Sequence, residues 1–134
     1  MKKFLAACLA LLMMVSLTGC GGKVEMDLVS WTYGDNTYYT SQITALTGEA
    51  TFDSKFKEGT ISISLSGDTL TYKISDQKFY KTTDSGNQMY EYKVTSDDGS
   101  STTGYGIVGE SGGKATITVG FVSGETTMFY YKEK

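Results

Sequence analysis

The stretch TISISLSGDTLTYKI, residues 60–74, decides the fold of this chain. Apolar residues occupy every second position on both sides of a Ser-Gly-Asp sequence, and serine, threonine or lysine stands between them. The apolar positions are Ile61, Ile63, Leu65, Leu70, Tyr72 and Ile74. A period of two puts alternate side chains on opposite faces of a β-strand, and Ser-Gly-Asp is typical of a tight turn. The stretch therefore predicts an antiparallel β-hairpin with one apolar face.

The same alternation continues through most of the chain. It predicts strands at 24–33, 37–45, 49–57, 60–66, 69–75, 78–83, 88–96, 102–109, 114–122 and 126–132. Short links that contain glycine separate most of them, as in hairpins, because glycine readily adopts the positive φ of tight turns. Residues 40–48 also fit a short helix with Thr40 as its N-cap and Gly48 just beyond its end. No link is long enough for a crossover helix, so the sheet is expected to be antiparallel throughout.

Strands with one apolar face must bury that face, either between two stacked sheets or inside one closed barrel. Sequential hairpins favour an up-and-down meander, and closure removes its exposed edges. We therefore expect an all-β fold, an antiparallel meander of about 8–10 strands that forms a barrel or a strongly curled sheet. A β-sandwich is the alternative.

The first predicted strand changes phase near its middle. Met26 and Leu28 share one face, whereas Trp31 and Tyr33 fall on the other. An extra residue in one strand returns both sets to the same side of a sheet. The sequence therefore predicts a β-bulge or sharp bend near Leu28 and Val29.

The first twenty residues, MKKFLAACLALLMMVSLTGC, have the composition of a targeting segment. Lys2 and Lys3 precede an apolar run over residues 4–15, which suits a signal-peptide core but not a bilayer span of about 20 residues. The segment ends in Leu17-Thr18-Gly19-Cys20, which resembles the lipobox of bacterial lipoproteins. The resemblance implies that residues 1–19 are removed as a signal peptide and that Cys20 becomes a diacylglyceryl-modified first residue.

The lipobox resemblance also implies a place for the rest of the chain. Two acyl chains on Cys20 anchor a protein stably in a membrane. Residues 20–23 would then form a tether of about 14 Å at most. Residues 24–134 would form a single β domain on the extracytoplasmic face of the cell membrane, in an envelope of one membrane or two. The alternative is an ordinary secretory signal with a cysteine nearby, or a cysteine that is a buried structural thiol.

Composition narrows the function. The sequence has 15 acidic residues and 12 lysines, no arginine and no histidine, and removal of the leader leaves a formal charge of −5. An acidic surface argues against nucleic acid as a partner and against electrostatic adhesion to anionic headgroups. Without histidine there is no Ser-His-Asp relay or mixed Cys/His zinc site, and without arginine no bidentate phosphate clamp. We therefore expect no enzyme, no metal site and no cofactor.

The acidic residues leave two possibilities to weigh. Asp97-Asp98-Gly99 resembles a fragment of a calcium loop, but it lacks the alternating ligand spacing and is interpreted as a hairpin turn. A carboxylate-based enzyme would require one acidic residue that is buried and has a raised pKa.

A lone tryptophan, Trp31, lies in the first predicted strand. In this respect the chain resembles the lipocalin-like (calycin) domains of bacterial lipoproteins, where a Gly-x-Trp motif opens the barrel and a late arginine packs over the indole. Val29 stands at the glycine position here, and Lys132 or Lys134 would have to cover the ring in place of arginine. The resemblance implies a lipocalin-like barrel.

The chain has ten tyrosines, all of them after the leader. Strand alternation predicts that Tyr72, Tyr90, Tyr92 and Tyr105 point inward, together with Trp31. These rings either fill a core, as is common in β proteins, or line a lumen for a small apolar or amphipathic ligand. The first function considered is therefore a lipid-anchored binding module.

Two runs of adjacent aromatic residues behave differently, because neighbours on a strand face opposite ways. They are Tyr38-Tyr39 and Phe129-Tyr130-Tyr131. At least one ring of each run is expected on the outer face, where a gathered patch would form an interaction surface. The alternative function is therefore an interaction lipoprotein with a filled core, whose partner is a protein or a cell-wall glycan.

Overall fold

A computed structural model describes residues 23–134; the predicted signal peptide and Cys20 lie outside the described residues. Within that range the chain forms nine strands and no helix. The strands are β1 (Lys23–Tyr33), β2 (Asn36–Tyr39), β3 (Leu46–Asp53), β4 (Gly59–Leu65), β5 (Asp68–Thr82), β6 (Gln88–Ser96), β7 (Ser101–Ser111), β8 (Lys114–Ser123) and β9 (Glu125–Glu133).

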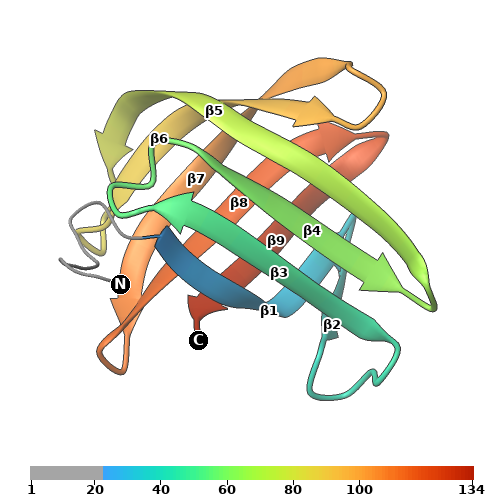
Figure 1. Cartoon of the computed structure of the whole chain (residues 1–134). Helices are drawn as coiled ribbons and strands as arrows, with labels where there is room; N and C mark the ends of the chain where they lie inside the picture. Colours follow the sequence, from blue (N-terminus) through green and yellow to red (C-terminus); the bar gives the residue numbers. More distant parts are fainter. Residues whose placement is uncertain (1–22) are drawn as a thin grey trace, which may run out of the picture.

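The strands form one antiparallel sheet that closes on itself (Figure 1). Their order is β2-β1-β3-β4-β5-β6-β7-β8-β9, and β9 pairs back to β1. Along one edge of β1, the first half pairs with β3 and the second half with β2. The fold is therefore an eight-stranded barrel with β2 as an additional strand, which confirms the predicted meander in its barrel form.

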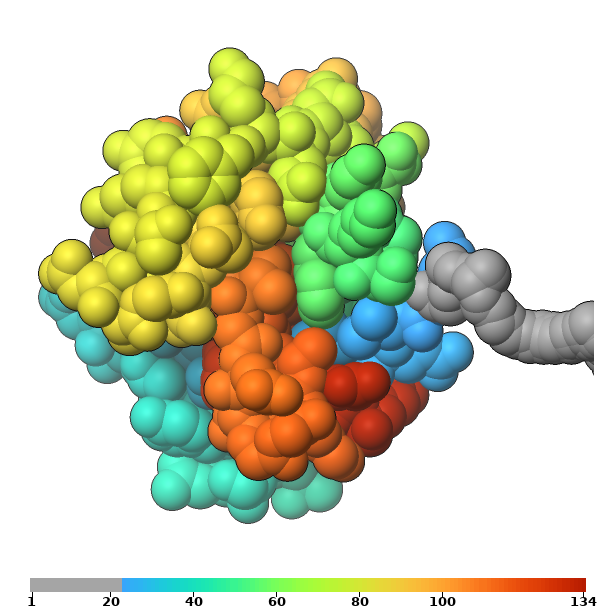
Figure 2. Space-filling view, turned by 90° about the vertical axis from the view of Figure 1, so that its left-hand side faces the viewer, coloured from blue at the N-terminus to red at the C-terminus, as the bar shows by residue number. Residues whose placement is uncertain are grey.

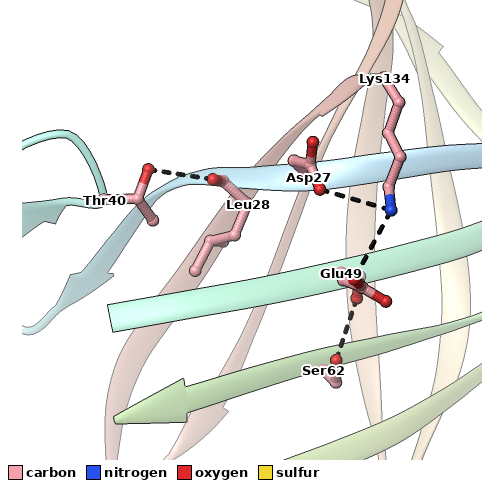
Figure 3. Close-up of polar contacts among 6 residues, drawn as sticks. All are labelled: Asp27, Leu28, Thr40, Glu49, Ser62 and Lys134. Carbon is pink, nitrogen blue, oxygen red and sulfur yellow. Dashed lines mark hydrogen bonds and ion pairs between the residues drawn. The ribbon is translucent and has the colours of Figure 1, made fainter. Parts of the chain in front are cut away.

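A β-bulge interrupts β1 at the predicted place. Leu28 lies opposite Tyr131 of β9, but the next paired residue is Ser30, so Val29 is the extra residue. The Thr40 hydroxyl donates toward the carbonyl oxygen of Leu28 at 3.1 Å (Figure 3). It also lies 3.2 Å from the carbonyl oxygen of Val29 and donates toward it. Thr40 therefore supports the bulge from a turn, and the helix considered for residues 40–48 does not form.

Three strand assignments differ from the sequence prediction by more than two residues or in the number of strands. The predicted segment 37–45 ends at Tyr39, and the predicted segment 49–57 is instead Leu46–Asp53 followed by a loop. The segments 69–75 and 78–83 belong to one strand, β5, which pairs with β6 on both sides of an irregularity between Ser75 and Lys78. Asp76, within that irregularity, has a φ of 57°, so a local kink there resembled a strand end in the sequence.

The hairpins divide the barrel into two ends, seen left and right in Figure 1. We call the left-hand end proximal; it carries Lys23, Lys134, the loop 54–58, the β5–β6 tip and the β7–β8 turn. The right-hand end, called distal, carries the turns around 34–35, 66–67, 97–100 and 124 and the loop 40–45.

Side chains fill the barrel. Buried residues come from β1, β3, β4, β5, β6, β8 and β9 and include Met26, Leu28, Phe52, Ile61, Ile74, Val94, Ile117 and Val119. Two of the inward positions on β7 are Gly104 and Gly106, where an added Cβ would lie 2.7 Å from Val94 Cγ2 and from Tyr92 Cε2, respectively. The two glycines therefore give room to large side chains from β6, and the space they leave is occupied.

Candidate functional site

The proximal end is closed by the loop 54–58. Phe56 packs its ring on Phe52, with ring centroids 5.3 Å apart, and is 6% exposed although its φ is 56°. The Asp53 carboxylate accepts hydrogen bonds from three backbone N–H groups of the loop, at 2.8–3.1 Å. Partial burial favours a higher pKa for Asp53, but these hydrogen bonds lower it overall. Figure 2 shows this face, with the loop in green beside the yellow β5–β6 hairpin and the orange β7–β8 turn.

Tyr92 holds the loop from inside the barrel. Its hydroxyl donates to the carbonyl oxygen of Phe56 at 2.6 Å and accepts from the Gln77 amide at 3.3 Å. Burial raises the pKa of Tyr92 to about 12. Tyr92 points inward as predicted. Its ring is buried in the core and its hydroxyl is hydrogen-bonded to Phe56 and Gln77, so neither faces a ligand cavity.

Two of the rings predicted for an outer surface are buried instead. Phe129 is 2% exposed and Tyr131 is not exposed. The Tyr131 hydroxyl donates to the backbone oxygen of Ser62 at 2.8 Å, and burial raises its pKa. Phe129 and Tyr131 face the interior because Val119 and Ile117 lie opposite them on β8. The prediction that this run forms a surface is therefore wrong for these two residues.

Tyr130 and Tyr39 lie on the outer face, as expected for one ring of each run. Both are register partners of Ser30, Tyr39 from β2 and Tyr130 from β9. Two strand spacings correspond to about 10 Å between their Cα atoms. Tyr39 is 45% exposed, whereas Tyr130 is half-buried. The two rings therefore share a face without forming a continuous stack.

Tyr105 does not point inward, contrary to the prediction. Its neighbours Gly104 and Gly106 face the core, so Tyr105 faces out, where its ring lies 5.1 Å from that of Tyr80 on β5. Tyr90 is half-buried on the inner face near the proximal end, 6.2 Å from the ring of Tyr92. Tyr105 therefore lies on the outside of the barrel, and Tyr90 packs near Tyr92 on the inside.

An apolar pocket opens at the distal end beside Trp31. Its volume is about 260 Å³, and its walls are Trp31, Tyr38, Ile43, Leu46 and Leu65. The rings of Trp31 and Tyr38 are 5.3 Å apart. No charged side chain lines the pocket. It can therefore receive an uncharged apolar group, with an aromatic wall on one side and aliphatic walls on the other.

Trp31 is held in place by the barrel rather than by a cation. Its indole N–H donates to the Thr127 hydroxyl at 2.9 Å, and Thr127 is 3% exposed. The lysine cover suggested by the lipocalin resemblance is not seen for Lys134, whose Nζ lies 3.7 Å from Asp27 and 3.5 Å from Glu49 (Figure 3). Lys132 is the register partner of Asp27, four positions before Trp31. The indole is therefore covered by Tyr38 and Tyr33 instead.

Tyr72 borders a second distal cleft of about 250 Å³ between β5, β6, β7 and β8. Its ring lies 4.9 Å from Phe121 and 6.1 Å from Phe129, so one side is fixed by the core. The rest of the rim is mostly hydroxyl groups and the Asp98 carboxylate. This cleft is more polar than the pocket at Trp31.

Asp98 belongs to the predicted hairpin turn. Its carboxylate accepts from the hydroxyls of Ser100 and Ser96, at 2.6 and 2.7 Å, and from the Ser100 backbone N–H at 2.9 Å. These hydrogen bonds lower the pKa of Asp98 to about 2. Across residues 23–134 the buried polar side chains are Thr116 and Thr127, so the buried acid that a carboxylate enzyme requires is not found there. The same residues contain no acidic or cysteine cluster suited to a metal ion.

The sequence prediction identified some of the residues that line the distal pocket, but not the pocket itself. It named Trp31 and Tyr38, though for different sites, and it placed Leu65 on the apolar face of its strand. It missed Ile43 and Leu46, because the loop 40–45 was divided between a strand and a helix. Alternation in Leu46, Gly48 and Ala50 was the signal that could have placed the start of β3 correctly.

Comparison with family models, with curated proteins and with solved structures finds no match for this chain. Within residues 23–134, no helix has the length and hydropathy needed to cross a membrane.

Proposed function

We propose that this protein is a lipid-anchored, extracytoplasmic binding module whose ligand site is the distal pocket beside Trp31. The apolar pocket carries the proposal, because its five lining residues come from β1, β2, β3, β4 and the loop 40–45 and contribute no charge. The ligand is a small apolar or amphipathic molecule. It binds at the mouth of the barrel, since the lumen is filled by side chains.

The size of the pocket limits what it can hold. Small-molecule sites are commonly about 300–1,000 Å³, whereas this pocket measures about 260 Å³. It suits one ring or a short acyl segment, with the remainder of the ligand in solvent. An amphipathic molecule meets both conditions, because its polar part stays outside the apolar walls.

The anchor supports this arrangement. Cys20 precedes Lys23 by three residues, which span about 10 Å when extended, and Lys23 lies at the proximal end. A diacylglyceryl group on Cys20 would hold that end against the membrane. The pocket at Trp31 would then open away from the membrane, toward the aqueous side of the envelope.

A second candidate function rests on Tyr39 and Tyr130, which flank Ser30 on the outer face. Exposed tyrosines on a flat sheet suit the planar face of a sugar ring or an apolar side chain. In this alternative the protein binds a cell-wall glycan or a protein partner through that face.

Fluorescence of Trp31, the single tryptophan of the chain, tests the pocket directly. We expect saturable changes in its emission on titration with monomeric octyl glucoside, which combines a short alkyl chain with a sugar ring. Leu65→Ser should weaken the response, because Leu65 lines the pocket, and Leu70→Ser should not, because it does not. The two leucines are matched distal residues, 42% and 58% exposed.

Two further measurements separate the alternatives. A response to N-acetylglucosamine that disappears in Tyr39→Ser and persists in Leu65→Ser would replace the pocket with the outer face as the site. The absence of a saturable response to either probe would overturn the proposed binding function. Mass spectrometry of the full chain produced in a bacterium, compared with Cys20→Ser, tests the lipid anchor independently of both.

A further inference from the structure

The charges of the protein are divided unevenly between the two ends of the barrel. The distal turns and loops, with the first residues of the strands that follow them, carry five acidic residues, and none of the described lysines lies there. These acidic residues are Asp35, Asp68, Asp97, Asp98 and Glu125. Nine of the ten described lysines lie at or near the proximal end, among acidic residues of similar number. These lysines are Lys23, Lys55, Lys57, Lys73, Lys78, Lys81, Lys114, Lys132 and Lys134.

The negative charge is therefore concentrated on one end. At the proximal end the Asp53 carboxylate is satisfied by backbone N–H groups, and Lys134 lies beside Asp27 and Glu49. An anionic membrane surface would repel the distal end and leave the proximal end almost unaffected. The formal net charge of −5 describes the whole chain after removal of the leader, so it does not show how the charge is distributed between the two ends.

The proximal end also exposes two large aromatic rings on β5. Phe79 is 56% exposed and Tyr80 is 53% exposed. They lie in the sequence Lys78-Phe79-Tyr80-Lys81, and Lys81 Nζ is 5.8 Å from the centre of the Tyr80 ring. The part of β5 that carries them lies beyond the irregularity after Ser75, toward the β5–β6 tip.

The two rings project from opposite faces of the β5–β6 hairpin, since Phe79 is the register partner of the inward-facing Tyr90 and Tyr80 packs on the outward-facing Tyr105. Each ring packs on a neighbouring ring, so their exposure does not come from a loose segment. The Phe79 ring lies 6.2 Å from Tyr90 in an edge-on arrangement, and the Tyr80 ring lies 5.1 Å from Tyr105. Lys78 is paired with Glu91 at 3.8 Å on the outer face of β6. Aromatic rings flanked by lysines are the side chains that favour the interface between headgroups and water.

We propose that Lys78–Lys81 is a second membrane contact, in which Phe79 and Tyr80 enter the headgroup region of the bilayer that holds the Cys20 anchor. This inference rests on the proposed anchor, since Lys23 leaves the barrel at the same end as these rings. The lipid chains supply most of the attachment, and the two rings set the orientation of the barrel. The acidic distal end, with the pocket at Trp31, is thereby directed away from the lipid surface.

Tryptophan quenching by brominated lipids measures this orientation. Residues 20–134, which contain the whole barrel, have one thiol, and Cys20 can be coupled to a maleimide lipid in vesicles of phosphatidylcholine and phosphatidylglycerol. Coupling makes the test independent of lipidation in cells. In a Trp31→Phe background, Tyr80→Trp reports on the proximal end and Val122→Trp on the distal end, where Val122 is 63% exposed.

We expect brominated acyl chains to quench the tryptophan at position 80 severalfold more strongly than the one at position 122, with a blue-shifted emission at position 80 only. Phe79→Trp provides a second proximal reporter in case Tyr80→Trp does not fold, as judged by circular dichroism. Equal quenching at both ends, or stronger quenching at position 122, would overturn the proposal. Failure of lipidation in cells would overturn the anchor, and failure of the Trp31 titration would overturn the pocket; neither result mimics the quenching pattern.

Discussion

Replacement of Phe56 tests whether one ring, held in an unusual backbone conformation, closes the proximal end. Phe56 is 6% exposed, packs on Phe52 and has a φ of 56°. Phe56→Ala and Phe56→Gly remove the same ring, but only glycine adopts this φ without steric cost. We therefore expect glycine to be the better replacement, the reverse of the order in regular strands.

The magnitude follows from burial and backbone conformation. Truncation of a buried phenylalanine to alanine costs about 3–5 kcal/mol, and a loop residue that can relax toward solvent belongs near the lower value. A left-handed conformation costs an L-residue such as alanine about 1–2 kcal/mol, and glycine avoids this cost. Glycine loses more conformational entropy on folding than alanine, which lowers its advantage by about 0.5–1 kcal/mol. Phe56→Gly should therefore be more stable than Phe56→Ala by about 0.5–1 kcal/mol.

Urea unfolding followed by Trp31 fluorescence measures the loss of stability in Phe56→Ala and in Phe56→Gly. Trp31 lies at the distal end, so a substitution at the proximal end does not alter the surroundings of the reporter directly. With a slope of about 2 kcal/mol per molar urea, a loss of about 3 kcal/mol moves the midpoint by about 1.5 M. Phe79→Ala is the matched control and should move it little, since Phe79 is 56% exposed. A Phe56→Ala midpoint as high as that of Phe79→Ala, or a Phe56→Gly midpoint below that of Phe56→Ala, would refute this account of the loop.

Gly106→Ala should cost about 1–3 kcal/mol by overpacking, because its Cβ would lie 2.7 Å from Tyr92 Cε2; an unchanged urea midpoint would contradict this. Thr127→Val should cost about 1–2 kcal/mol, since the Trp31 indole N–H loses its acceptor, and less in a Trp31→Phe background. The lowered pKa of Asp98, about 2, stabilises the fold above the unfolded pKa, and this stabilisation disappears as pH falls through about 2. Asp98→Asn should therefore be less stable than the parent at pH 7 and equally stable near pH 2, and a constant difference would disprove the linkage.

Local alternation was enough to predict the barrel, because each strand has one buried face and each hairpin is short. Even the bulge in β1 was visible, since Leu28 and Trp31 cannot share a face without an extra residue. The loop 40–45 could not be predicted in the same way. Its conformation depends on the hydrogen bonds from the Thr40 hydroxyl to the carbonyl oxygens of Leu28 and Val29. These contacts join a loop to a different strand, so they leave no periodic pattern in the sequence.

The candidate site was harder to predict than the fold, because the side that a ring faces depends on its neighbours. Tyr105 lies between two glycines that face the core. A prediction that places the more apolar side chains inside puts Tyr105 inward and the glycines outward, which is the reverse of what the structure shows. Phe129 and Tyr131 have an apolar neighbour, Tyr130, so alternation was masked and their burial was decided by register with β8. Phe79 and Tyr80 were assigned to a separate short strand, and their exposure at the proximal end depends on how β5 and β6 continue.

Closure of the barrel between β1 and β9 has a consequence for the order of folding. The other pairings join strands that lie close together in the chain, whereas Trp31 and Thr127 at the seam are 96 positions apart. Hairpins form in microseconds, but the entropic cost of closing a loop rises with its length. The seam is therefore expected to close last. Until then β1 and β9 are open sheet edges that a second copy can pair with, so a newly synthesised chain is most vulnerable to aggregation at this seam.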